Sequence, residues 1–185
     1  MEGFTTEYNG IISNEKIDVQ KVEFARQVIL GLQNELSKYM QNGFGPFLAV
    51  IYDEQGNIVS KCSNSVVNDN CSLNHAEINA IRKAEEIFGT YDLSKYNLSI
   101  YVTAEPCIMC LGAILWSGIK AVYYGVKSCD VEQITGYDEG FKPNWFKEFS
   151  NRGITVYGNI EPESGRDVLK KYIKAGSVVY KPSRK

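Results

Sequence analysis

The chain has 185 residues, of which 44% are hydrophobic and 23% charged, and its formal net charge is −2. This length and composition fit one soluble globular domain with a sizeable core, and they are too polar for a membrane protein or a disordered tail. The longest apolar runs fall well short of the roughly 20 residues that a membrane helix needs. The slightly acidic balance makes a nucleic-acid partner unlikely, because phosphate binding needs clustered Lys and Arg.

The N-terminal sequence MEGFTTEYNG lacks the basic start and the apolar core of a signal peptide, so we expect a cytoplasmic protein. The five cysteines are odd in number and unevenly spaced, which does not suit a disulfide framework. We therefore expect reduced thiols, some of them available as metal ligands.

The first predicted elements are an arm, a helix and a hairpin. Residues 1–17 show no sustained period and we expect a surface arm, with a single domain over 18–185. Asp18 is a typical helix N-cap, and apolar residues recur after it at three- and four-residue steps up to Gly43, which predicts one long helix. Two short runs, 47–52 and 58–63, lie on either side of a Gly-containing turn and predict a hairpin.

Helices and strands then alternate. Helices are predicted over HAEINAIRKAEEIFG, from Pro106 to Trp116, and over 143–150 and 166–175; strands are predicted over 98–103, 121–126 and 154–157. This order predicts a three-layer α/β/α sandwich around a five-stranded mixed sheet.

Two motifs at predicted helix starts carry the chemistry. Cys107 and Cys110 are spaced i, i+3 in a first helical turn, where both sulfurs can face one point and the helix amides favour the thiolate. His75, the one histidine of the chain, adds a third ligand, and three protein ligands leave the fourth position of a catalytic zinc open for water. Glu77 is near enough to contact that water without binding zinc.

Other interpretations of these motifs stay open at this point. A CxxC pair also occurs in thioredoxin-like redox sites and as half of a structural zinc site. Cys71, four residues before His75, could complete a closed Cys3His site, which would make the chain a zinc-stabilised binding module with no catalysis. Against this, Cys71 lies in a polar loop, whereas the other three residues lie at helix starts.

The combination H-x-E…P-C-x-x-C is the signature of zinc nucleobase deaminases. From about Val22 to Tyr157 the sequence resembles the cytidine deaminase-like superfamily. Within it, the segments GPF (45–47), HAEINAIRKA and EPCIMCLGAILW, together with Asn64, are most similar to small bacterial guanine deaminases. Cytosine deaminases and tRNA adenosine deaminases are the next most similar.

The resemblance implies zinc-dependent hydrolysis of guanine to xanthine and ammonia, with Glu77 moving the protons. It also implies that Asn64 hydrogen-bonds the base, that Phe47 packs on its face and that Trp116 walls the pocket. Glu139, in Gly136-Tyr-Asp-Glu139, would be a second catalytic carboxylate that faces the leaving amine. For each of the last four residues an ordinary role remains open: core packing for the aromatic residues, a turn cap for Asn64 and an exposed loop for Glu139.

Several positions depart from the guanine deaminase pattern. Ser72-Leu73-Asn74 stands where the family commonly has Pro-Thr-Ala, the segment after Gly136 is longer, and Tyr180 only loosely matches the C-terminal aromatic residue that caps the pocket. Cytosine, another small aminated ring and a tRNA adenosine therefore remain alternative substrates. We also expect a homodimer, because the group builds its pockets near subunit contacts and the apolar helix over 107–116 offers a packing face.

Overall fold

The computed structural model describes residues 5–181, in which seven strands form one mixed sheet. The strand order is β1-β2-β7-β6-β5-β3-β4. The β5–β6 and β6–β7 pairs are parallel and the other pairs are antiparallel. The strands are β1 (Thr6–Tyr8), β2 (Ile11–Ser13), β3 (Leu48–Tyr52), β4 (Ile58–Ser63), β5 (Ser99–Ala104), β6 (Ala121–Val126) and β7 (Thr155–Gly158).

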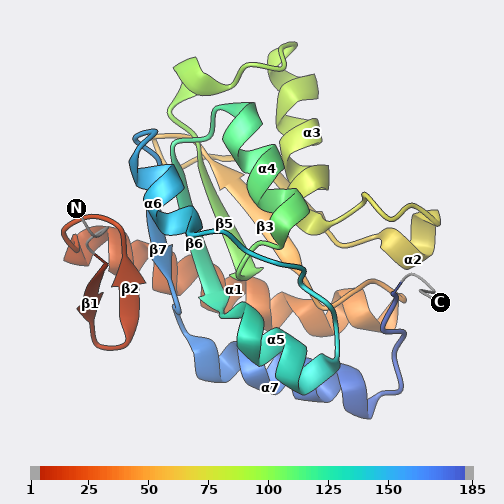
Figure 1. Cartoon of the computed structure of the whole chain (residues 1–185). Coiled ribbons are helices and arrows are strands. Elements are labelled where there is room, and N and C mark those ends of the chain that lie inside the picture. The colour runs from red at the N-terminus through yellow and green to blue at the C-terminus, as the bar shows by residue number, and fades with distance from the viewer. Residues whose placement is uncertain (1–4, 182–185) are drawn as a thin grey trace.

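Helices cover both faces of this sheet, so the predicted three-layer α/β architecture is confirmed (Figure 1). One face carries α3 (Ala76–Phe88), α4 (Ile108–Ser117) and α6 (Trp145–Ser150), and the other carries α1 (Val19–Gln41), α5 (Ser128–Thr135) and α7 (Pro162–Lys174). Short turns of helix, α2 (Val66–Asp69) and η1 (Ser94–Tyr96), lie in the connections. Separate hydrophobic clusters fill the two spaces between helices and sheet.

The predicted count of five strands is wrong, because two more strands come from the segment expected to be an arm. There, β1 and β2 form a hairpin whose second strand pairs with β7. Asn14 fixes this edge: its side-chain amide donates to the carbonyl of Ile154 at 2.9 Å and accepts from the N–H of Val156 at 2.8 Å. Strands of three residues are too short to show a hydrophobic alternation, so the pairing was not visible in the sequence.

Caps explain where the predicted helices begin and end. The Asp18 carboxylate accepts from the N–H groups of Gln20 and Lys21, at 2.9 and 3.3 Å, and so starts α1. Gly118 ends α4 with φ +87°, and a Cβ there would lie 2.7 Å from the backbone nitrogen of Ser94. An L residue with a side chain would be strained in this left-handed conformation and would clash with Ser94, so glycine is needed at the end of α4.

In the described part of the chain, no helix combines the length and the apolar character needed to cross a membrane. The short helices α2 and η1 and the helix α5 were not predicted, and α7 begins at Pro162, four residues before the expected start at 166. Parallel β5 and β6 lie at the centre, and the turn that follows β5 leads directly into α4, which positions the residues described next.

Candidate active site

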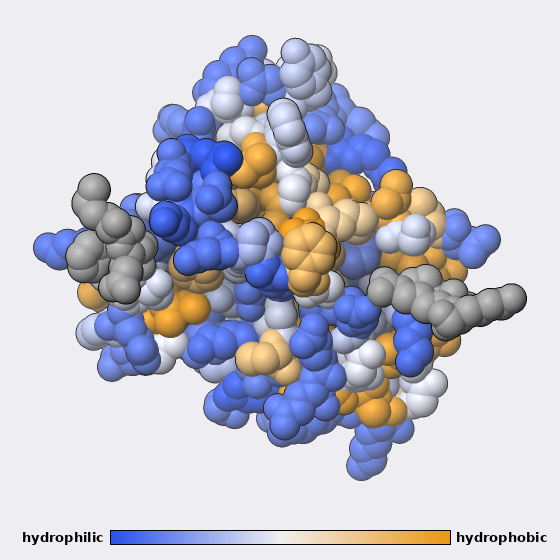
Figure 2. Space-filling model, viewed as in Figure 1, coloured by the Kyte–Doolittle hydropathy of each residue, from blue (hydrophilic) through white to orange (hydrophobic). Residues whose placement is uncertain are grey.

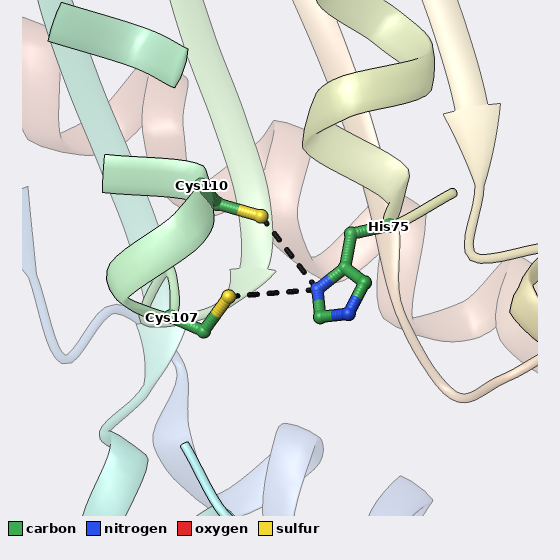
Figure 3. A group of neighbouring side chains, drawn as sticks. All are labelled: His75, Cys107 and Cys110. Atoms are coloured by element: carbon green, nitrogen blue, oxygen red, sulfur yellow. Dashed lines mark hydrogen bonds between the residues drawn. The ribbon is translucent and has the colours of Figure 1, made fainter. Parts of the chain in front are cut away.

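Two helix starts converge on one point between the sheet and the α3–α4 layer. His75 is the N-cap of α3 and Cys107 is the N-cap of α4, both with extended backbone, and Cys110 lies in the first turn of α4. The imidazole Nδ1 of His75 lies 3.5 Å from Sγ of Cys107 and 3.6 Å from Sγ of Cys110 (Figure 3). The three side chains point toward one another from two separate helices.

These distances fit a tetrahedral zinc ion. Bond lengths of about 2.3 Å for Zn–S and about 2.0–2.1 Å for Zn–N, at tetrahedral angles, place nitrogen and sulfur roughly 3.6 Å apart. All the ligand atoms of the triad lie within 4.8 Å of one another, and Cys71 is not part of this group. The triad therefore offers three ligands of a catalytic type and does not form the closed Cys3His arrangement.

The two thiols of the triad differ: the hydrogen bond to Cys107 and burial raise the pKa of Cys110 well above its usual value, whereas Cys107 is prepared for a cation. Hydrogen bonds from Cys110 and from His75 lower the pKa of the Cys107 thiol to about 4, although burial acts in the opposite direction. Cys107 is therefore a thiolate at neutral pH, which is the form that binds metal.

The outer nitrogen of His75 contacts the C-terminal segment. Nε2 lies 3.3 Å from the hydroxyl of Tyr180, and the Asn64 side-chain amide donates to the same hydroxyl at 2.8 Å. When Nδ1 holds a metal, the ring proton is on Nε2 and is donated to Tyr180, which fixes the tautomer and the orientation of the ring. Tyr180 thus joins the metal ligand to Asn64.

A cavity of about 280 Å³ opens beside the triad. It lies between the ends of β3 and β5, the starts of α3 and α4, the loop after α5 and the C-terminal segment. The residues of its wall that bear on the chemistry are Phe47, His75, Glu77, Cys107, Tyr137, Glu139 and Tyr180.

Four acidic residues line this cavity, Glu77, Glu105, Asp138 and Glu139, and burial raises the pKa of Glu77 and of Glu139. Glu77 is 8% exposed, and burial followed by the neighbouring Cys107 thiolate raises its pKa. Burial likewise raises the pKa of Glu139 to about 8, although the positive charge of Lys142 acts to lower it. Glu139 can therefore hold a proton near neutral pH, and the raised pKa of Glu77 makes it a stronger base than an ordinary carboxylate; general acid–base catalysis uses both properties.

The structure brings five of the eight residues singled out in the sequence into contact with the cavity and places three elsewhere. Phe47 lines it, with its ring edge-on to Tyr137 at 5.6 Å. Cys110 is fully buried behind Cys107. Asn64 is 1% exposed, does not line the cavity and lies behind Tyr180.

Trp116 does not wall the cavity of this chain. Its side chain is 83% exposed, because it lies on the outward stripe of α4 rather than on the stripe that packs on the sheet. Trp116 therefore neither lines the cavity, as the resemblance implied, nor packs in the core, which was the alternative.

The loop before His75 depends on residues that no motif indicated. Asp69 accepts from Ser65 at 2.6 Å and from Asn74 at 2.8 Å. Asn79 of α3 donates to the carbonyls of Ser63 and Asn74, at 3.0 and 3.3 Å. Asn74, which departs from the family pattern, is therefore an anchor of this loop, and only the density of Asn, Asp and Ser in 64–74 signalled such a network in the sequence.

Comparison with known proteins places this geometry in a family. Residues 22–126, more than half of the chain, match the cytidine and deoxycytidylate deaminase zinc-binding region. The chain belongs to this family.

The individual proteins that the chain resembles are deaminases of two kinds. The chain is 42% identical to a guanine deaminase of Bacillus subtilis over 97 residues, which are 52% of this chain and 60% of that protein. It is 47% identical to a tRNA-specific adenosine deaminase of Rickettsia bellii over 81 residues, or 43% of this chain and 54% of that protein. The chain thus spans a little over half the length of these curated relatives.

The solved structure of a guanine deaminase from Nitrosomonas europaea extends the similarity to most of the fold. It has a TM-score of 0.74 and 33% identity, and the match covers 78% of this chain and 81% of that one.

We expect about one zinc ion per chain, because three converging ligands form a prearranged site. His75→Ala should lose the metal, whereas Cys71→Ser should keep it, since Cys71 is outside the triad. Elemental analysis of the purified proteins measures both, and metal loss in the Cys71 variant would favour the closed structural site.

Proposed function

We propose that this protein is a zinc-dependent deaminase that hydrolyses guanine to xanthine and ammonia. The observation that carries the proposal is that two carboxyl groups, the buried Glu77 and the half-buried Glu139, share one small cavity with a triad that fits a catalytic zinc. Such a pair can supply both proton transfers of a hydrolytic deamination. The guanine deaminases among the relatives support the choice of base.

The roles follow from the placement of the groups. Zinc bound by the triad would lower the pKa of a water molecule toward 7. Glu77 would accept a proton from that water as its oxygen adds to C2 of the ring, and would then transfer the proton to a ring nitrogen. Because burial raises its pKa to about 8, Glu139 would hold a proton at neutral pH and donate it to the departing amine. As the C2–N bond breaks and ammonia leaves, the new hydroxyl group at C2 loses its proton to give the carbonyl of xanthine, and that proton restores the acid.

The size and lining of the cavity favour a free base. Its volume of about 280 Å³ is at the lower edge of the roughly 300–1,000 Å³ common for drug-sized ligands. Phe47 and Tyr137 offer aromatic faces to a flat ring. A tRNA substrate would call for a basic surface, whereas this chain has a net charge of −2.

Wild-type protein should release ammonia from guanine faster than from cytosine, isocytosine, adenine or their nucleosides. Glu77→Gln should keep its zinc and its fold and lose about 1,000-fold or more in turnover, because one residue acts as both base and acid. An ammonia-release assay, with zinc content and thermal unfolding as controls, decides this. If a different base were turned over fastest, that base and not guanine would be the substrate. A Glu77→Gln protein with normal turnover would refute the proton-transfer role.

Glu139→Gln should lower kcat and kcat/KM by similar factors and leave KM nearly unchanged, because a proton donor to the leaving group acts in the transition state. In the wild type, kcat should fall as the pH rises above the pKa of the donor, because the deprotonated carboxylate has no proton to give. Steady-state kinetics on guanine as a function of pH measure both. A normal kcat in the variant would leave Glu139 without a catalytic role.

We also propose that the chain forms a homodimer through α4. The outward stripe of this helix is Met109, Gly112, Ala113 and Trp116, spaced i, i+3, i+4 and i+7, and the helix contains no charged residue. Figure 2 shows apolar residues gathered around α4 at the centre of this face, between hydrophilic areas. A Cβ at Gly112 would meet nothing within 4 Å, so a second helix has room to approach closely.

Sedimentation at micromolar concentration should give a dimer for the wild type and for Tyr91→Glu, and a monomer for Trp116→Glu. The two aromatic residues are equally exposed, at 83%, but Tyr91 lies in the loop after α3 and is not part of the outward stripe of α4. Burying an unpaired carboxylate in an apolar interface is costly, so the charge should separate the subunits only at position 116. A wild-type monomer would refute the dimer.

A further inference from the structure

The position of Glu139 depends on a residue that the proposed chemistry does not use. Glu139 lies in the loop that joins α5 to α6, which crosses the front of the molecule in Figure 1. A loop places a carboxyl group reliably only if other elements hold it. In this protein the support comes from the turn that carries Cys107.

Glu105, two residues before Cys107, is the centre of this support. Its carboxylate accepts from the N–H of Ser128 at the start of α5 and from the indole Nε1 of Trp145 in α6, each at 3.0 Å. It also forms an ion pair with Lys142 at 3.5 Å. One carboxylate thus holds both helices that flank the loop and a residue of the loop itself.

Lys142 is unusually buried for a lysine. Its side chain is 14% exposed and that of Glu105 is 13% exposed, and the ammonium group also donates to the hydroxyl of Ser128. Lysine side chains rarely leave water unless they are paired. Loss of one partner of such a pair leaves the other charge buried and uncompensated, so this contact holds the loop in one place.

A second contact ties the same loop to the same turn. Gly140 has φ +74°, and a Cβ there would lie 3.1 Å from the side chain of Ile108, so the loop backbone lies against the first residue of α4. Positions 105 and 108, on either side of Cys107, therefore contact positions 142 and 140. Glu139 is adjacent to this double attachment.

We propose that Lys142, anchored on Glu105, is a positioning residue that fixes the Glu139 carboxyl group relative to the turn of Cys107. Lys142 does not line the cavity, so it acts through Glu139 and not on the substrate. The assignment rests on the proposed function, which gives Glu139 a proton to deliver. Lys142 also places a positive charge near that carboxyl group, which opposes the effect of burial on it.

Hydrogen exchange measured by mass spectrometry tests the attachment without any activity assay. The variants are Lys142→Met, which keeps the length and removes the charge, Lys142→Arg, which keeps the charge, and Lys147→Met, which removes an exposed lysine from α6. Amides of 136–144 should exchange faster in Lys142→Met alone, with α3 unchanged and zinc content equal to that of the wild type. Unchanged exchange of 136–144 in Lys142→Met would overturn the proposal, whatever the activity.

Kinetics then test whether the attachment acts through Glu139. On the base that the wild type deaminates, Lys142→Met should lower kcat about tenfold or more at nearly constant KM, because misplacing a catalytic group by about 1 Å can cost that much. Lys142→Arg and Lys147→Met should stay close to the wild type. In a Glu139→Gln background Lys142→Met should cost nothing further, since residues acting as a unit are not additive.

The outcomes separate the two proposals. Additive losses in the double variant would overturn positioning through Glu139 while leaving the deaminase intact. A wild type that deaminated none of the bases would overturn the proposed function, and the exchange experiment would still decide whether Lys142 holds the loop.

Discussion

The site of this protein depends on the convergence of two helix starts. His75 and the Cys107–Cys110 pair come from the starts of two different helices, α3 and α4, and their ligand atoms lie within 4.8 Å of one another. Each helix start supplies free N–H groups and a positive end, which suits a thiolate and an anionic cavity. The central parallel strands, the caps and the loop networks all serve to keep these two starts facing each other.

Burial gives that arrangement its acid–base character. An isolated carboxyl group in water would be ionised at neutral pH, but Glu77 and Glu139 lie where the charged form is poorly solvated, and each has its pKa raised. The Cys107 thiol responds in the opposite direction because it has hydrogen-bond donors close by. One small cavity thus holds a readily formed anion for the metal and two carboxyl groups that bind a proton more readily than they would in water.

The sequence predicted those features that short-range patterns encode. The apolar period of α1, its Asp18 cap and the two motifs all act within a few residues, so the layers and the triad could be predicted. The strands β1 and β2 could not be predicted, because β2 pairs with β7 and Asn14 fixes this contact through bonds to residues some 140 positions away. The same reason hid the contacts of Tyr180 and the burial of Lys142. Trp116 was misplaced because a helix of nearly uniform apolarity does not reveal which of its stripes faces the sheet.

The hydrogen bonds of Tyr180 also tie the site to the C-terminal segment of the fold. They join positions 105 and 116 apart in the chain, whereas the two cysteines lie within one helical turn. Closing a long loop costs entropy before its contacts contribute, so such contacts form late in folding. The cysteine pair lies within the first turn of α4, whereas Tyr180 reaches His75 and Asn64 only when the segment after α7 is in place. We therefore expect the ring of His75 to be fully oriented for a metal only in the completed fold.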